Sequence, residues 1–185
     1  FFVVQNITEE SKEVIYAYGM ELLISDVLNT IIVLLIALFS HTLPAVVVFI
    51  AVFMGLRQFV GGFHANSHLS CMFTLVMVMM VFSYGICNVS GHITPIFSIS
   101  FIMIALPIIL CIAPVPHPNK PMSEEKSVKL RKRSCILAVT LSVVTIALLV
   151  FQYQKLSLYV SSGMLLSAIM ALLGHFLNRG DNSKR

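Results

Sequence analysis

Residues 43–71, LPAVVVFIAVFMGLRQFVGGFHANSHLSC, consist of an apolar run followed by a short polar break. The run has no charged residue before Arg57, and the glycine pair Gly61-Gly62 closes it. A helix needs about 17–25 apolar residues to cross a bilayer, so this stretch predicts a membrane-spanning helix that ends near the glycine pair. Just after the break, His64 and Cys71 place an imidazole and a thiol seven residues apart.

The composition of the whole chain indicates the same class. Hydrophobic residues make up 58% of the 185 residues and charged residues only 11%, whereas about a quarter of an average soluble domain is charged. A soluble core of this length cannot bury so much apolar surface. We therefore expect an all-α integral membrane protein in which residues 1–185 form one membrane-embedded domain without a separate soluble module.

Six apolar stretches are each about as long as a spanning helix. We predict transmembrane helices over Leu22–Phe39, Leu43–Gly62, Leu69–Cys87, Pro95–Ala113, Ser134–Gln152 and Leu156–Leu177. Before them, Ile7 to Glu21 starts with acidic residues and repeats apolar residues at helical spacing. We interpret residues 1–21 as an amphipathic interfacial helix, with a short solvated helix as the alternative. Phe1–Val4 is too short for a signal sequence, and we expect none.

The distribution of Lys and Arg predicts the orientation of these helices. With both termini in the cytoplasm, eleven of the twelve basic residues fall on the cytoplasmic side, and only Lys155 falls outside. We therefore predict a multi-pass protein of the cell membrane with cytoplasmic ends. Basic residues interleaved with aromatic ones on a soluble face do not occur, so we expect no nucleic-acid partner.

A polar loop is expected between the fourth and fifth spans, over residues 114–133. Its first part, Ala113 to Pro121, contains too many prolines for a helix and should be extended. Its second part carries a cluster that we call the basic segment: Lys126, Lys129, Arg131, Lys132 and Arg133. Such a cluster beside a span binds anionic lipid headgroups, and an acidic peptide is the alternative ligand.

The candidate chemistry lies in residues 57–71. On one continuous helix the Cα atoms of His64 and Cys71 would be about 10.5 Å apart, too far for their side chains to form a hydrogen bond. The glycine pair predicts a break between them, and Ser67 is a suitable N-cap for the next helix. Cys71 would then lie in the first turn of that helix, where backbone amides and the helix dipole favour a thiolate.

Simpler interpretations of the cysteines compete with this one. A buried cysteine is often an apolar filler, and the chain has three others, Cys87, Cys111 and Cys135. Cys135 follows the basic segment and is the rival nucleophile, although no histidine is close to it in sequence. No cysteine pair has C-x-x-C spacing, and we expect no disulfide on the reducing cytoplasmic side.

A zinc site is the other chemical alternative. His64, His68 and Cys71 form an H-x3-H-x2-C pattern whose side chains are suitable zinc ligands. A zinc hydrolase also needs a base, however, and neither Glu nor Asp occurs from residue 27 to residue 123. We therefore expect no metal and no cofactor.

The pattern R-x3-G-G-x-H-A-x5-C over Arg57–Cys71, followed by A-P-x4-N-K-P and the basic segment, resembles the AgrB family. These are the accessory gene regulator B membrane peptidases of Gram-positive quorum sensing. The resemblance covers nearly the whole chain, and the Gly-Gly-x-His-Ala element with its cysteine is the most specific part. It implies a plasma-membrane protein whose active site lies near the cytoplasmic face.

The resemblance implies a cysteine endopeptidase that acts on an AgrD-type propeptide. His64 matches the family's catalytic histidine and Cys71 its nucleophile, and Arg57 matches an arginine seven residues before that histidine. Family members cut the propeptide near its C-terminus, retain the product as an enzyme thioester and release a cyclic thiolactone or lactone autoinducing peptide. They are also described as homodimers. The expected substrate-binding residues are Arg57, Gln58 and the basic segment.

Two other functions remain as alternatives. Six spans permit a small peptide or solute transporter, but no mid-membrane charge and no internal repeat favours one. A non-catalytic membrane scaffold is the third possibility. Three residues are candidates for the group that orients His64 or lines the oxyanion site, and the sequence does not choose among them: Gln58, Asn66 and Ser67.

Overall fold

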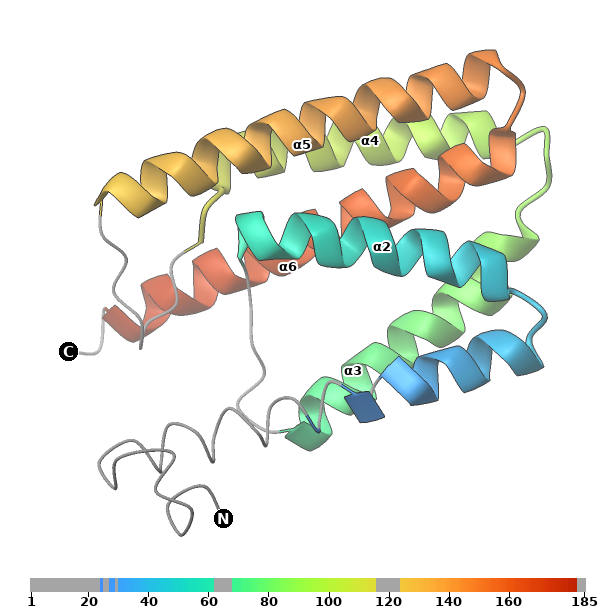
Figure 1. Cartoon of the computed structure of the whole chain (residues 1–185), viewed down its shortest axis with the longest axis horizontal. Coiled ribbons are helices and arrows are strands. Elements are labelled where there is room, and N and C mark those ends of the chain that lie inside the picture. Colours follow the sequence, from blue (N-terminus) through green and yellow to red (C-terminus); the bar gives the residue numbers. More distant parts are fainter. Residues whose placement is uncertain (1–23, 25–26, 29, 62–67, 116–123, 183–185) are drawn as a thin grey trace, which may run out of the picture.

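The computed structural model in Figure 1 describes residues 24, 27–28, 30–61, 68–115 and 124–182, without the side chains of residues 68–72, 75, 124, 126 and 177–182. The interfacial helix predicted over residues 1–21 lies outside this range. The labelled helices are α2 (Leu43–Val60), α3 (His68–Met80), α4 (Thr94–Ile112), α5 (Glu124–Val150) and α6 (Gln154–Asn182). An apolar helix, Thr30–Phe39, precedes α2, and a π-helical turn and a 3-10 turn extend α3 to Asn88.

Within the described residues, four helices are long and apolar enough to cross a membrane. They are Leu43–Val60, Thr94–Ile112, Ser127–Val150 and Gln154–Phe176, which correspond to the second, fourth, fifth and sixth predicted spans. Two shorter apolar helices, Thr30–Phe39 and Val76–Asn88, lie within the first and third predicted spans. The all-helical membrane class is confirmed, whereas six complete spans and the orientation of the termini remain predictions.

The start of α5 differs from the prediction. Residues 124–133, expected in the loop over 114–133, are helical and continuous with the fifth span. Lys, Arg and Glu are good helix formers. The Nζ atom of Lys129 also forms an ion pair with the Oε1 atom of Glu125, one turn earlier, at 2.6 Å. The 27 residues of α5 are about 40 Å long, against about 30 Å of hydrocarbon. Its polar first turns therefore extend beyond the apolar layer.

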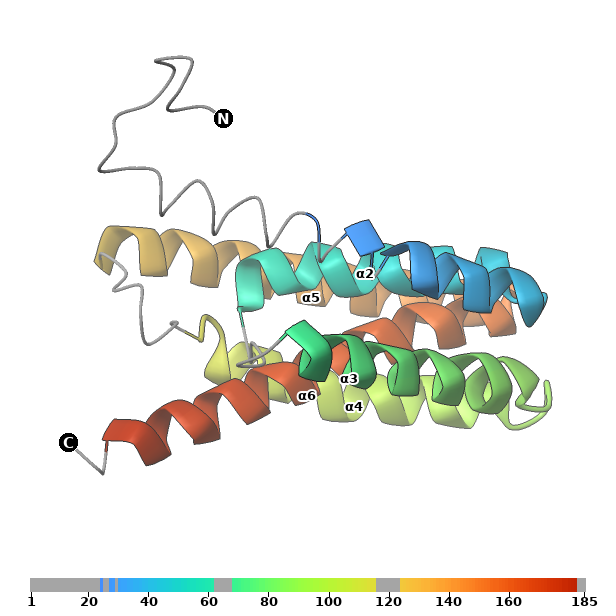
Figure 2. The same cartoon turned by 90° about the horizontal axis from the view of Figure 1, so that it is seen from below.

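The helix α6 lies at the centre of the bundle, in contact with α2, α4 and α5 (Figure 2). Its buried face consists largely of small residues, among them Ser157, Ser161, Ser162, Gly163, Ser167, Ala168 and Ala171. Small side chains let helix backbones approach closely, which is how helices associate in lipid. The hydroxyls are satisfied locally, since Ser161 donates to the carbonyl of Leu158 and Ser167 to that of Gly163.

Two buried clusters hold the helices together. One cluster joins the C-terminal half of α2 to α4, α5 and α6: Leu56, Val60, Ala105, Ile109, Ala113, Val115, Ala138, Met164, Ala168 and Ala171. The other attaches the helix Thr30–Phe39 and the end of α3 to α2: Val33, Ala37, Ala45, Val46, Phe49, Met79 and Phe82. In the second cluster, the ring centroids of Phe49 and Phe82 are 4.3 Å apart.

Gly163 provides a test of the α2–α6 contact. A Cβ atom at this position would lie 2.9 Å from the carbonyl oxygen of Phe49 and 3.1 Å from the side chain of Val52. Because the first of these neighbours is backbone, we expect Gly163→Ala to lower the free energy of unfolding by about 1–3 kcal/mol.

Gly55→Ala is the matched control, since nothing lies within 4 Å of a Cβ atom built there. This change should be neutral or stabilising by up to ~1 kcal/mol through helix propensity. Denaturant unfolding of both variants in detergent micelles measures the difference, and equal stabilities would show that α2 and α6 do not pack so closely.

Candidate functional site

The predicted site residues that the structure describes belong to one end of the bundle, which we call the site end. There α2, α4 and α6 finish while α3 and α5 begin (Figures 1 and 2). The turns around Thr42, Gly91 and Gln152 lie at the opposite end. The last turn of α2 and the start of α5, which are far apart in sequence, therefore lie at the same end of the molecule.

The helix break predicted at the glycine pair is confirmed at Gly61. The helix α2 ends at Val60, Gly61 has a φ of +74°, and α3 begins at His68. His64 itself lies outside the described residues, as does the side chain of Cys71. A hydrogen bond between the imidazole and the thiol, and a break in the helix between the two residues, therefore remain predictions.

Cys71 occupies the position in α3 that was predicted for it. It is the fourth residue of a helix that starts at His68, so it lies in the first turn. At about 100° per residue, position 71 falls within roughly 20° of Val78, which is half-buried and packs against the second cluster. Phe73 and Met77 lie on the opposite side and are exposed. The backbone register therefore places position 71 on the same face of α3 as Val78.

Arg57 and Gln58 lie in the last turn of α2, just before the break. Arg57 is half-buried, and its guanidinium carbon is 5.6 Å from the centroid of the Phe53 ring, within range of a cation–π interaction. Gln58 is exposed. Asn66 and Ser67, the other candidates for orienting His64, lie outside the described residues.

The basic segment forms an exposed helical surface at the start of α5. Lys129, Arg131, Lys132 and Arg133 are all exposed, and the side chain of Lys126 is outside the described residues. Lys129 pairs with Glu125 at 2.6 Å, but an exposed ion pair contributes only about 0–1 kcal/mol. These cations therefore remain accessible to an anionic ligand.

A backbone contact at the site end was not predicted from the sequence. The amide of Val115 donates a 2.9 Å hydrogen bond to the carbonyl of Val60, and Gly61 and Val115 form an isolated parallel bridge. The glycine pair signalled a break in the helix, but nothing in the sequence pointed to the partner 54 residues later. The bridge joins Gly61, three positions before His64, to Val115 in the proline-rich part of the loop.

The clusters needed for a metal centre are not seen in the part of the chain that the structure describes. No group of three or more His, Cys, Asp or Glu side chains is close enough there to hold an ion. Of the possible zinc ligands, His64 and the side chains of His68 and Cys71 fall outside that part, so the zinc alternative is not tested by this search.

Comparison with known proteins identifies one family. The family model for accessory gene regulator B, AgrB, matches residues 2–171. An AgrB-like protein of Clostridium beijerinckii is 24% identical over 134 residues, which cover 70% of this chain and 65% of the relative. The matched chain thus spans slightly less than two thirds of that relative's length. No solved structure matches significantly.

The positions of Arg131 and Lys155 at opposite ends of the bundle allow a test of orientation. We expect Arg131→Cys to be cytoplasmic and Lys155→Cys to be external, each in a chain whose four natural cysteines are alanine. A membrane-impermeant maleimide should label position 155 in intact protoplasts and position 131 only after permeabilisation. Labelling of position 131 from outside would reverse the predicted orientation.

Proposed function

The chain belongs to the AgrB family, and on this basis we propose that it is a membrane-embedded cysteine endopeptidase that processes an AgrD-type propeptide. Family membership supports a role in producing an autoinducing peptide. We further propose that Cys71 is the nucleophile, that His64 is its base, and that the product is cyclised. The protein is expected to act in the plasma membrane, near the cytoplasmic face, as a homodimer.

The observation that carries this proposal is the position of Cys71 in the first described turn of α3, ten residues after the break in the backbone at Gly61. The first amides of a helix have no partner within the helix, and the dipole there is positive. Both features favour a thiolate, the reactive form of cysteine. The same amides can stabilise the oxyanion that forms when the thiolate attacks a carbonyl.

The proposed reaction has two balanced steps. First, the Cys71 thiolate attacks the carbonyl carbon of the scissile bond, and the C–N bond breaks as the leaving amine takes a proton from the His64 imidazolium. The C-terminal fragment leaves, while the N-terminal fragment stays on Cys71 as a thioester. Second, a thiol or hydroxyl within that fragment attacks the thioester and gives its proton to His64. The ring closes, and the Cys71 thiolate is released.

The location of this chemistry helps the second step. Cys71 belongs to α3, an apolar helix of a membrane protein, and we propose that water has limited access to a thioester formed there. An intramolecular nucleophile can then compete with hydrolysis because it is already held close to the carbonyl. The thioester also keeps an activated acyl group for ring closure.

Substrate capture is proposed for the exposed cations of the site end. The basic segment lies on the first turns of α5, where it can attract an acidic propeptide tail and anionic lipid headgroups. Arg57 and Gln58, in the last turn of α2, are proposed to contact the substrate closer to the break. An amphipathic leader on the propeptide would lie in the same membrane surface.

The nucleophile is tested by substitution. Cys71→Ala should abolish propeptide cleavage while the protein still inserts in the membrane, because no acyl-enzyme can form. Cys135→Ala, which removes the rival thiol, should retain activity. Cleavage is followed by mass spectrometry, which should also detect the N-terminal fragment bound to Cys71 in the active chain. Full cleavage by Cys71→Ala would contradict the proposed function.

The role of the basic segment is tested by neutralisation. Changing Lys129, Arg131, Lys132 and Arg133 together to Gln should raise KM about tenfold, equivalent to ~1.4 kcal/mol, with kcat little changed. KM of the unchanged protein should rise with salt, whereas KM of the variant should respond weakly.

Lys155→Gln, at the opposite end of the bundle, is the control and should leave both constants unchanged. If KM of the fourfold variant equalled that of the unchanged protein at low salt, the basic segment would not capture the substrate.

A further inference from the structure

The helix α2 ends at Gly61, where the chain forms a backbone contact with Val115. Gly61 donates to the carbonyl of Arg57 at 3.0 Å and so closes the last turn of α2. One residue earlier, the carbonyl of Val60 accepts a 2.9 Å hydrogen bond from the amide of Val115. The contact between Gly61 and Val115 therefore uses backbone atoms alone, and side-chain changes at position 115 leave its donor in place.

Glycine is required at position 61 for two independent reasons. Its φ of +74° and ψ of −152° fall in a region that residues with a side chain rarely adopt. A Cβ atom at this position would also lie 2.5 Å from the carbonyl oxygen of Val115. Since that neighbour is backbone, it cannot rotate away. Gly55, one and a half turns earlier in the same helix, has φ in the helical range and no atom within 4 Å of such a Cβ.

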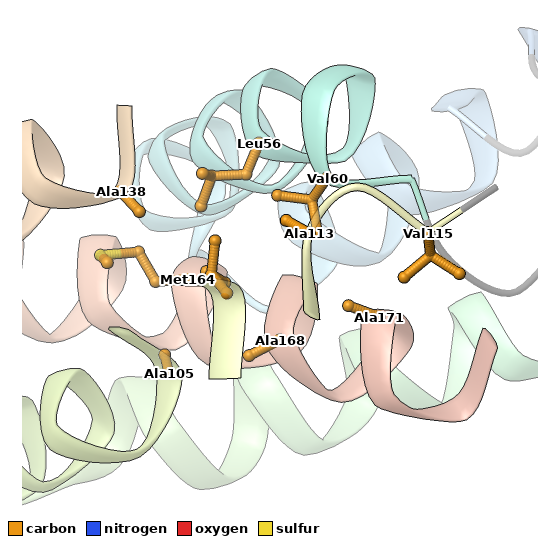
Figure 3. Close-up of a cluster of buried hydrophobic side chains, with 10 residues drawn as sticks. Leu56, Val60, Ala105, Ala113, Val115, Ala138, Met164, Ala168 and Ala171 are labelled. Atoms are coloured by element: carbon orange, nitrogen blue, oxygen red, sulfur yellow. The ribbon is translucent and has the colours of Figure 1, made fainter. Parts of the chain in front are cut away.

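Buried side chains pack against the contact between Gly61 and Val115. Val60, Ala113 and Val115 are buried and belong to the same cluster as Leu56, Ala168 and Ala171 (Figure 3). In Figure 3 the segment of Ala113 and Val115 runs beside the end of α2, with α6 beneath both. The bridge is therefore fixed to the central helix of the bundle and is not a contact between two free loops.

The bridge fixes the end of α2 from which the chain continues toward His64. His64 is the third residue after Gly61, and the described part of α3 begins at His68. The direction in which the chain leaves α2 is set by the dihedral angles of Gly61 and by its contact with Val115. We propose that Gly61 is a positioning residue: its bridge to Val115 fixes the point and the direction in which the chain leaves α2, and the ionisation of Cys71 by His64 depends on that bridge. This inference rests on the proposed roles of His64 and Cys71.

The experiment compares Gly61→Ala with Gly55→Ala and Val115→Ala in the full-length protein in nanodiscs. Gly61→Ala adds the Cβ that cannot fit, whereas Val115→Ala keeps the backbone donor of the bridge. Two quantities are measured for each: propeptide cleavage, and the pH dependence of Cys71 alkylation by iodoacetamide, resolved by mass spectrometry. Cys111 and Cys87 in the same chain are the references for an exposed and a half-buried thiol.

For Gly61→Ala we expect kcat to fall about a hundredfold with KM changed less than threefold, as when an oriented catalytic group is displaced. Alkylation of Cys71 at pH 7 should fall about tenfold, and its pH midpoint should rise toward the ordinary cysteine value of about 8.5. Both control variants should stay within threefold of the unchanged protein, and alkylation of Cys111 and Cys87 should be the same in all chains.

Wild-type kcat and wild-type Cys71 alkylation in Gly61→Ala would overturn the inference. A rise in the alkylation of Cys87 would show that Gly61→Ala has lost its fold. In that case Val115→Pro is measured in its place, because it removes the amide donor of the bridge without adding a Cβ at position 61. If both variants lost their fold, the bridge would serve the stability of the protein and not the positioning of its site, and this result would also overturn the inference. The alkylation readout needs no substrate, so it is separate from the proposed function, which fails if Cys71→Ala still cleaves.

Discussion

The close packing of α6 against its neighbours is the constraint on which the rest of this molecule depends. Lipid tails are as apolar as the helices, so helices in a bilayer associate through close van der Waals contact instead of the hydrophobic effect. The α6 helix makes that contact possible with a face of Ser, Gly and Ala residues, and at Gly163 its backbone approaches the carbonyl of Phe49. Because α2, α4 and α5 all contact α6, its position sets where they end and therefore where the site residues emerge.

The same environment confines irregular backbone to the ends of the bundle. A backbone polar group without a partner is costly in lipid, and the break after Val60 occurs where α2 reaches the site end. Even there the carbonyl of Val60 receives a donor, from Val115. The freed amides that a cysteine nucleophile needs are therefore expected only where a helix starts at such an end, and Cys71 is placed at one of these starts.

The parts of this structure that follow from local sequence were predictable, and those that follow from packing were not. Four spans could be located because an apolar run of sufficient length has few alternatives to a helix. The break near Gly61 followed from glycine's conformational freedom. The early start of α5 was missed because charges argue against a span, although Lys, Arg and Glu readily form a helix outside the apolar layer.

Features that depend on contacts between distant parts of the chain could not be predicted from local sequence patterns. The bridge from Gly61 to Val115 joins residues 54 positions apart, and the central place of α6 depends on three neighbours at once. One further consequence comes from the length of α5. Since an α-helix has a fixed rise, Glu124 lies about 10 Å outside the hydrocarbon if Val150 lies at its opposite boundary. On that scale Lys129 is about 3 Å outside the boundary, and Arg131, Lys132 and Arg133 lie close to it. An anionic group that pairs with these cations is therefore held at the level where the apolar part of the bundle ends, and not in bulk water above it.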